Sequence, residues 1–531
     1  MLSACKRFFT GTQGMAIAAI ALGISVFLSR ILGLVRDKVI SFYFGASLEA
    51  DVYFMAFVVP DFLNYLLAGG YFSITLIPLL AQNFAKDEEN GWQFFSSAVC
   101  WAALAIASLT FIAWLCTPWL APLLAPDFPA EAQQRLSFFL RIILPAQVCF
   151  LPGACFTALL YHRRQFAVPA LTPLVYNGCI ILGGMLFLYA FPGRGMEGFC
   201  WGVLAGAALG SLCLPLLAAK QGGLRFSPRL KHPDMRTVLF LALPLMLGQS
   251  IVALDEQFVR IFGSLTGEGG VSLLNYARRI MLVPVGVVAQ AAGLAAYPFL
   301  AALAAKRAHE EFGQSLNGAL GNTLLIALPL SLWMLVAAEP TMRLIFQQGS
   351  FSSQDASNSG ILLAIMLSGV AFWAVQQILG RAFYAYQDTL TPALAGTAAT
   401  LVALPLYWLG AKLLGAPGVA LAGTAGVAAY TLLLCVVWQR KHGPLALAGT
   451  VSTALRCFAF CLPACALAYG SCLGLDLALN PESLWSAFCK IAFSGIIFAA
   501  AYLGLTHFFA PALCAPILEF CGKIRRKLWK R

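Results

Sequence analysis

Arginine side chains inside apolar segments are the residues of this sequence best suited to chemistry. Arg30 follows an apolar run that begins at Met15, and Arg36 comes six residues later. Arg278 and Arg279 form a second pair at the start of another apolar stretch. An arginine fork matches phosphate oxygens bidentately, and several forks in a medium of low dielectric constant need an anion or carboxylates nearby. The pattern therefore predicts a site for an anionic, phosphate-bearing substrate.

Two carboxylates of the neighbouring apolar segment are candidate partners for these arginines. Asp51 begins that segment, and Asp61 lies about one third along it, beside Pro60. A carboxylate inside a membrane span usually faces the interior of the bundle and has a partner. We expect Asp51 either to hold an arginine of the first segment, as part of the site, or to stabilise a helix N-terminus through the helix dipole.

A third group of charges, Asp255, Glu256 and Arg260, lies within a later apolar segment. Glu256 and Arg260 are four positions apart, which suits an ion pair on one helix face, whereas the spacing of Asp255 does not. Two interpretations follow. The group is either a local pair that neutralises the arginine or a site that couples transport to a cation or a proton.

The composition shows which medium surrounds these charges. The chain has 531 residues, 60% hydrophobic and 11% charged, with a mean hydropathy of +0.82. A soluble domain carries about 25% charged residues, so the surrounding medium must be lipid. We predict an all-α polytopic membrane protein with about fourteen spans of about 20 residues or more, near residues 15–36, 52–80, 94–121, 136–160, 168–190, 198–219, 237–263, 272–300, 314–337, 360–381, 391–411, 418–438, 451–472 and 485–508.

The charges between the spans predict the orientation of the chain. If the N-terminus is cytoplasmic, the cytoplasmic connections carry most of the lysines and arginines, and the opposite connections carry mostly acids. This asymmetry fits the positive-inside rule with both termini in the cytoplasm. The net charge of +12 includes a basic C-terminal run, which we assign to anionic membrane lipids rather than nucleic acid.

The sequence offers little for other chemistry. Most of the sixteen cysteines lie inside apolar spans, as small buried hydrophobic residues do. The chain has no P-loop, zinc-ligand spacing, Ser/His/Asp set or dinucleotide-binding loop. It therefore predicts neither an enzyme nor a bound metal or cofactor.

An internal repeat divides most of the chain. Tyr161 precedes Pro169-Ala170-Leu171 by eight residues, and Tyr384 precedes Pro392-Ala393-Leu394 by eight, 223 residues further on. A second pair of matching segments is offset by 220 residues. Six spans per repeat give both halves the same orientation, which predicts a pseudo-twofold axis along the membrane normal and a central cavity. The predicted parts are residues 1–222 and 223–440, the two six-helix lobes, and 441–531, two further helices and a basic tail.

Five groups of residues spread over nearly the whole chain match strings of one known transporter family. They are SRILGLVRD at 29–37, FGA at 44–46, RQFAVPAL at 164–171, YARR at 276–279 with PVG at 284–286, and RAFYAYQDT at 381–389. With these strings the chain resembles the MviN/MurJ family, within the superfamily of multidrug, oligosaccharidyl-lipid and polysaccharide exporters.

The resemblance implies a flippase of the bacterial inner, cytoplasmic membrane that works by alternating access. Its substrate would be lipid II, the undecaprenyl-pyrophosphate-linked peptidoglycan precursor, moved from the inner to the outer leaflet. Arg30, Arg36, Asp51 and Arg279 match family positions that line a central cavity. The implied partners are this lipid-linked saccharide, membrane lipids and the cell-wall synthesis machinery.

The chain departs from the family pattern at three positions. Asn64 stands where the family usually has a cavity arginine, and Gly69 stands where it has a glutamate. Val259 occupies the place of an aspartate near which some relatives bind sodium, which argues against sodium coupling. The joint loss of arginine and glutamate is either a compensated exchange or the mark of a paralogue that exports another polyprenyl-linked glycan or a small cation. A membrane glycosyltransferase would need a large extramembrane loop, which the chain lacks.

Overall fold

Helices account for all regular secondary structure in the part of the chain that the structure, a computed structural model, describes: residues 11, 14–67, 71–443 and 447–511. Within these residues, eleven helical stretches are long and apolar enough to cross a membrane. The chain is therefore a multi-span helical membrane protein, as predicted. Gly69 and the basic C-terminal run lie outside the described residues.

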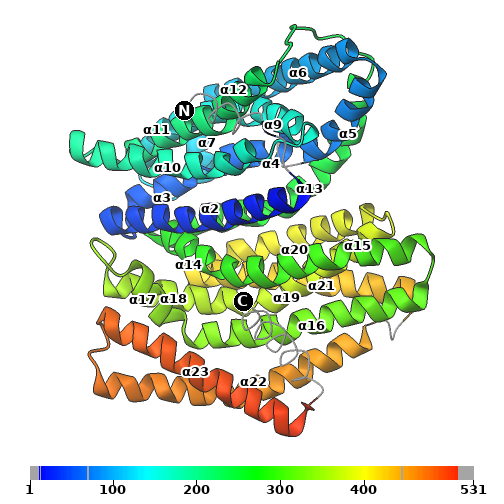
Figure 1. Cartoon of the computed structure of the whole chain (residues 1–531). Helices are drawn as coiled ribbons and strands as arrows, with labels where there is room; N and C mark the ends of the chain where they lie inside the picture. Colours follow the sequence, from blue (N-terminus) through cyan, green and yellow to red (C-terminus); the bar gives the residue numbers. More distant parts are fainter. Residues whose placement is uncertain (1–10, 12–13, 68–70, 444–446, 512–531) are drawn as a thin grey trace. The chain divides into compact units, whose positions relative to one another are not determined.

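The chain forms two compact units, Met1–Val271 and Ser272–Arg531. The first unit includes α13, whereas the predicted boundary between the two lobes lies earlier, at 222/223. The predicted lobes are defined by the internal repeat and not by compactness, so they stay a prediction. The helices of the first unit are labelled in Figure 1 where there is room: α2 (Met15–Phe44), α3 (Leu48–Met55), α4 (Val58–Leu67), α5 (Tyr71–Lys86), α6 (Glu88–Leu115), α7 (Thr117–Leu124), α8 (Ala130–Ile143), η1 (Leu144–Ala146), α9 (Gln147–His162), α10 (Ala167–Ala190), α11 (Gly195–Gly206), η2 (Ala207–Cys213), α12 (Leu214–Gln221), α13 (Met235–Gly263) and η3 (Ser264–Thr266).

The second unit ends in a helical hairpin, α22–α23, that packs on α16 (Figure 1). Cys457 and Cys461 are fully buried where α22 meets α16 and α23, among apolar neighbours, as the sequence predicts for small hydrophobic residues. The helices of this unit are α14 (Gly270–Pro284, which begins at the boundary), η4 (Val285–Gln290), α15 (Ala291–Ala305), α16 (His309–Val336), α17 (Ala338–Phe346), α18 (Ser353–Leu367), α19 (Val370–Ala385), α20 (Leu390–Leu414), α21 (Ala416–His442), α22 (Ala448–Ala478) and α23 (Leu484–Phe509).

Three of the expected spans fall on helices outside the eleven long apolar ones. The first coincides with α2, the seventh with α13, and the second is divided among α3, α4 and α5. α2 has 30 residues and continues to Phe44. Arg30, Arg36 and Asp37 therefore lie on one continuous helix, which fixes their relative directions.

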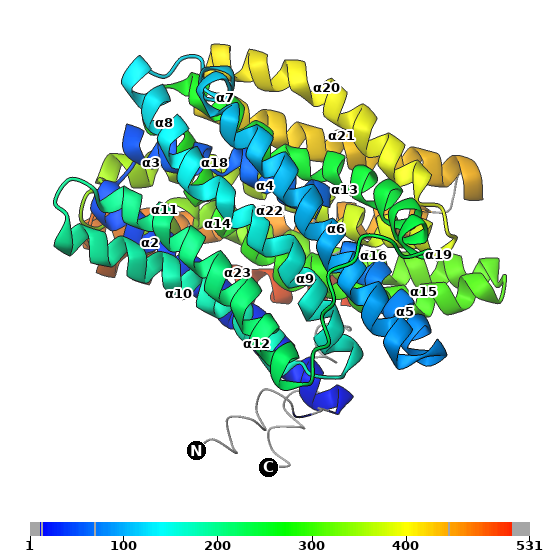
Figure 2. The same ribbon diagram turned by 90° about the horizontal axis from the view of Figure 1, so that it is seen from above.

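Glycines let two helical hairpins pack with their backbones almost in contact. A Cβ atom on Gly198 of α11 would lie 2.4 Å from the carbonyl oxygen of Gly183 on α10. A Cβ atom on Gly418 of α21 would lie 2.0 Å from the carbonyl oxygen of Gly410 on α20. Figure 2 shows both hairpins, α10–α11 and α20–α21. Close approach through small residues is the usual way in which helices associate in lipid, where apolar surface alone gives no drive to pack.

Two turns repeat the same backbone geometry. After α9, the amides of Arg164 and Gln165 donate to the carbonyls of Tyr161 and Leu160, and Arg164 has a φ of 57°. After α19, Gln387 and Asp388 donate to Tyr384 and Phe383 in the same way, and Gln387 has a φ of 60°. This pairing of hydrogen bonds around a left-handed residue is the Schellman motif that ends helices. The same motif also ends α12 at Gly223 and α15 at Arg307, so it is a general helix end in this chain, and the repeat stays a prediction.

We expect Gly198→Ala to destabilise the α10–α11 hairpin by about 1–3 kcal/mol, because the added methyl group meets backbone that cannot rotate away. Gly178→Ala on α10 is the matched control, since a Cβ atom there meets nothing within 4 Å. The thermal unfolding midpoint of the purified protein in detergent, followed by size-exclusion chromatography, measures the difference. Equal midpoints for the two variants would contradict the close-contact explanation.

Candidate functional site

The two arginines of α2 have different surroundings. Arg30 is exposed in the first unit, whereas the side chain of Arg36 is only 13% exposed. Arg36 donates from Nε and Nη2 to one oxygen of Asp37, at 3.0 and 2.9 Å, and Asp37 is itself buried. The sequence predicted the arginines but not this pairing between neighbours. A guanidinium held by one carboxylate oxygen keeps further N–H groups that can bind a second anion.

Asp51 is fully buried on the first turn of α3 and binds a turn that is distant in the sequence. One carboxylate oxygen accepts a hydrogen bond of 2.7 Å from the backbone amide of Gly269, in the connection between α13 and α14. Gly269 has a φ of 81°, and a Cβ atom there would lie 2.6 Å from the carbonyl oxygen of Ala46. The turn 267–270 is therefore held closely against the start of α3. The helix cap at this end is the side chain of Ser47, which accepts from Ala50.

Arg260 joins α13 to α4 through two carboxylates. It is 7% exposed, and its Nη1 and Nη2 donate to Asp61 and Glu256 at 2.7 Å each. The Glu256–Arg260 pair was one of the two interpretations of the sequence. The contact with Asp61 was not predicted, because 199 residues separate the two side chains. The sequence signal was that both charges lie inside apolar segments and each needs a partner.

The other predicted site residues are half-buried. Asn64 lies on α4, one helical turn after Asp61, in the first unit. Arg278 and Arg279 lie on α14 in the second unit, six residues or fewer before Pro284. A π-helical segment, η4, follows Pro284. Such segments are frequent at functional sites. The structure therefore brings Arg36, Asp37, Asp51, Asn64 and Asp61 into one unit and places Arg278 and Arg279 in the other.

A network around Glu197 was not predicted as part of any site. Its side chain is 4% exposed and accepts from Arg135 at 2.7 Å and from Arg194 at 2.6 Å. Arg135 also binds Glu49 at 2.9 Å and lies over the ring of Phe139. The network connects the first turns of α3 and α11 with the second turn of α8. Each arginine of this network pairs with a glutamate of the network, so its role is to hold the three helices together.

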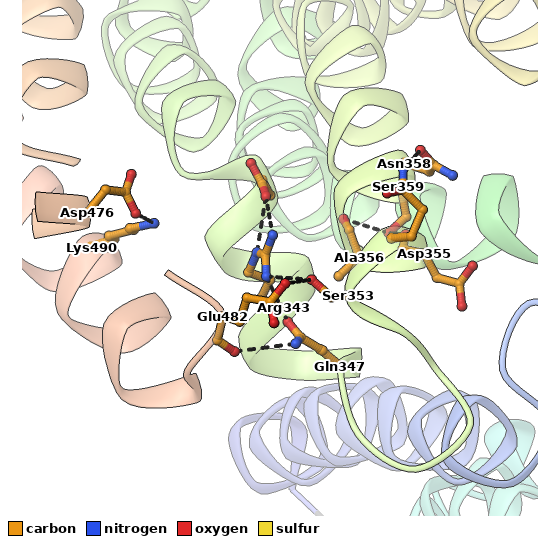
Figure 3. Close-up of polar contacts among 12 residues, drawn as sticks. Arg343, Gln347, Ser353, Asp355, Ala356, Asn358, Ser359, Asp476, Glu482 and Lys490 are labelled. Carbon is orange, nitrogen blue, oxygen red and sulfur yellow. Dashed lines mark hydrogen bonds and ion pairs between the residues drawn. The ribbon is translucent and has the colours of Figure 1, made fainter. Parts of the chain in front are cut away.

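A second network fastens the final hairpin in the second unit (Figure 3). Arg343 of α17 binds Glu339 at 2.7 Å and donates to Ser353 at 3.0 Å, and Ser353 donates to the carboxylate of Glu482 at 3.1 Å. Gln347 donates to the backbone of Glu482. Across the hairpin, Lys490 of α23 pairs with Asp476 of α22.

One string that carries the family resemblance has a structural role in the second unit. Asp388 accepts from the backbone and hydroxyl of Thr391, at 2.9 and 2.7 Å, and pairs with Lys441 of α21. Burial works to raise the pKa of Asp388, but the hydrogen bonds from Lys441 and Thr391 and the charge of Lys441 outweigh it and hold the pKa below its usual range. Asp388 thus ties the turn before α20 to the end of α21.

Comparison with known proteins gives one consistent family. A family model described as "Lipid II flippase MurJ" matches residues 40–480, a range that contains Asp51, Asn64, Arg278 and Arg279 and begins after Arg36. A probable lipid II flippase MurJ of Rhizobium meliloti is 29% identical over 427 residues, 78% of this chain and 79% of that protein. The lipid II flippase MurJ of Burkholderia cenocepacia is 27% identical over 432 residues, 78% of this chain and 82% of that protein.

Solved structures show the same fold. A lipid II flippase MurJ in an inward closed conformation has a TM-score of 0.76 and 24% identity, and the match covers 92% of this chain and 99% of that one. An inward-facing multidrug resistance transporter of the MATE family, in the MOP superfamily, has a TM-score of 0.66 and 16% identity, over 82% and 99% of the two chains. These two structures show that the chain has the same fold. The match to a family model of a lipid II flippase agrees with the prediction that the chain is not an enzyme.

We expect Asp51→Ala to release the turn at Gly269. Loss of a hydrogen bond to a charged group costs about 1.5–3 kcal/mol, so amide exchange at residues 267–270 should accelerate by roughly tenfold or more. Hydrogen–deuterium exchange of the purified chain measures this. Asp51→Asn is the control, since it keeps an acceptor oxygen. Unchanged exchange in the alanine variant would show that Asp51 does not hold the turn.

Proposed function

Because the chain belongs to the MurJ family of lipid II flippases, we propose that it moves lipid II from the inner to the outer leaflet of the bacterial cytoplasmic membrane. The observation that carries this proposal is the nearly buried guanidinium of Arg36 on α2, which already binds an anionic oxygen. A pyrophosphate presents the same kind of oxygen to the remaining donors. Buried arginine forks recognise phosphate better than lysine ammonium groups do.

In the proposed mechanism, the pyrophosphate headgroup enters from the cytoplasm and binds Arg36 and Arg30, with Asp51, Asn64, Arg278 and Arg279 as further residues of the cavity. The two predicted six-helix lobes then rock against each other and open the cavity to the opposite side. The sequence repeat, Tyr161 before Pro169-Ala170-Leu171 and Tyr384 before Pro392-Ala393-Leu394, supports this two-lobed arrangement. We further propose that both termini are cytoplasmic and that the flipped lipid passes to the cell-wall synthesis machinery.

A second candidate substrate is another polyprenyl-linked glycan. Asn64 is neutral where the resembling family carries an arginine, and one turn earlier Asp61 adds a carboxylate that is paired with Arg260. This changes the charge pattern of α4 without removing the arginines of α2. A headgroup with a different saccharide on the same pyrophosphate would fit the remaining pattern.

We expect Arg30→Ala, Arg36→Ala and Arg279→Ala each to lose roughly tenfold or more of lipid II flipping, since each removes a charge-assisted hydrogen bond worth about 1.5–3 kcal/mol. The measurement is lipid II exposure at the outer surface of spheroplasts that depend on this chain. Arg36→Lys should retain part of the activity, because the charge remains while the bidentate fork is lost.

Arg225→Ala is the matched control, because this arginine is 72% exposed on the connection before α13 and contacts Glu88 at 3.8 Å. All variants are compared at equal membrane content. Full activity in the three alanine variants would contradict the role of the arginines. Failure of the unaltered chain to replace a lipid II flippase, despite correct insertion, would favour the second substrate.

A further inference from the structure

The connection between α12 and α13, residues 222–234, lies along α6 within the first unit, and we call it the basic linker (Figure 2). Two of its backbone groups are bound by side chains of that helix. Trp101 Nε1 donates to the carbonyl oxygen of Leu230 at 2.7 Å. The amide of Ser227 donates to the hydroxyl of Ser96 at 3.1 Å. These contacts give the linker a fixed course on α6, although its backbone is irregular.

The exposed surface of α6 shows where the acyl chains of the membrane begin. Residues 91–99 are buried in the protein, except for the half-buried Gln93. The large apolar side chains of α6 that are exposed begin at Trp101, which is 44% exposed, and continue to Leu115. Tryptophan concentrates where the acyl chains of a membrane meet the headgroups. Trp101 therefore marks this boundary on α6.

The linker lies at this boundary, because its backbone is unsuited to the hydrocarbon. Irregular backbone that faces acyl chains leaves N–H and C=O groups without hydrogen-bond partners. The linker is not covered by protein, since Phe226 and Leu230 are 43% and 51% exposed. Its contact with Trp101 keeps it from lying further out in water. It therefore lies among the headgroups, and its two apolar side chains reach the outer end of the acyl chains.

Basic side chains outnumber acidic ones in and beside the linker. Residues 220–236 contain five lysines and arginines and one aspartate: Lys220, Arg225, Arg229, Lys231 and Arg236, with Asp234. Arg229 and Lys231 flank Leu230, so they stand at the boundary that Trp101 marks. Both are exposed, and neither has an ion pair among the residues that the structure describes. The partner that fits them carries negative charge.

Nearby acidic side chains do not neutralise this charge. Glu88 of α6 lies 3.8 Å from Arg225, and Asp234 lies 3.8 Å from Lys86 of α5. Contacts of this kind at the surface contribute little and are screened by salt. Both involve the ends of the linker, so the two basic residues beside Leu230 stay available to an external anion.

We propose that the basic linker binds the headgroups of anionic membrane lipids, with Arg229 and Lys231 on the phosphates and Phe226 and Leu230 at the outer end of the acyl chains. A lipid phosphate is the anion present at this level of the membrane, and basic residues are attracted to a surface of anionic lipids. An acidic protein or a nucleic acid would match the charges but not the exposed apolar side chains between them.

The linker also joins the two predicted six-helix lobes, whose boundary lies at 222/223. Lipids bound to it would hold this connection at the surface of the membrane. Binding itself does not depend on what the chain transports. Only the leaflet, which would be the cytoplasmic one, rests on the proposed function and its orientation of the chain.

Hydrogen–deuterium exchange of the full chain in lipid nanodiscs tests this proposal. One set of nanodiscs contains phosphatidylcholine alone, and the other contains phosphatidylcholine with phosphatidylglycerol. We expect the amides of residues 224–232 to exchange more slowly with phosphatidylglycerol, by roughly fivefold or more, because each basic side chain near an anionic surface adds to the binding. About 1 M salt, in which charges are screened beyond about 3 Å, should remove most of this protection.

The double variant Arg229→Gln with Lys231→Gln should lose the protection by phosphatidylglycerol. The matched control is Lys306→Gln with Arg440→Gln, which removes two exposed basic side chains elsewhere in the chain and should keep it. The proposal is overturned if the unaltered chain exchanges equally in the two nanodiscs, if the difference persists in the linker variant, or if the control variant loses it as well.

Two further arms identify the source of the anion. Inorganic phosphate and polyglutamate, each added to phosphatidylcholine nanodiscs, should give no protection. Protection by free phosphate would indicate a phosphate site, and protection by polyglutamate would indicate a site for an acidic protein; either result overturns the proposal. Where the linker variant fails to fold, the unaltered chain decides, because protection that persists in about 1 M salt also contradicts it. If the protection is present and lipid II is not flipped, the proposed substrate is wrong and lipid binding stands.

Discussion

Charged side chains inside the membrane spans are stabilised by partners of opposite charge, and this constraint organises much of the molecule. Arg36 binds the residue next to it, Arg260 binds two carboxylates, and Lys490 binds across a hairpin. An unpaired charge in a low-dielectric interior raises the free energy by more than the ion pair lowers it. The pairs therefore restrict which helices can lie side by side.

Charge pairs and small residues both hold the helices of each unit together. In lipid, apolar surface gives little preference for one neighbour over another, so specificity comes from close backbone contact and polar links. In the α10–α11 hairpin, Gly198 permits the close backbone contact. The network of Glu197 supplies the polar links, because it joins α3, α8 and α11 near their N-terminal ends. In the other unit, Glu482 and Arg343 tie the final hairpin to α17 and α18 through Ser353.

Local features were predictable from the sequence, whereas long-range pairs were not. The helices follow from apolar runs, and Glu256–Arg260 follows from helical spacing. The pairing of Asp61 with Arg260 needed the packing of α4 on α13, which no spacing rule gives. Asp51 shows both sides of this limit. Its place in the first turn of α3 fits the expected helix-dipole alternative, but its hydrogen bond from the amide of Gly269, 218 residues away, follows from no spacing rule.

The pairing of each arginine decides what it can bind and release. Under the proposed function, phosphate oxygens bind the N–H groups of Arg36 that Asp37 does not use. Asp37 already neutralises the guanidinium, so a phosphate gains less here than it would at an arginine without a carboxylate. Weaker binding of the substrate favours turnover over tight binding. Arg260 is different, because a phosphate that displaced Asp61 would still meet Glu256. Two carboxylates on one guanidinium repel a pyrophosphate, so Arg260 is not suited to the ligand that Arg36 can bind.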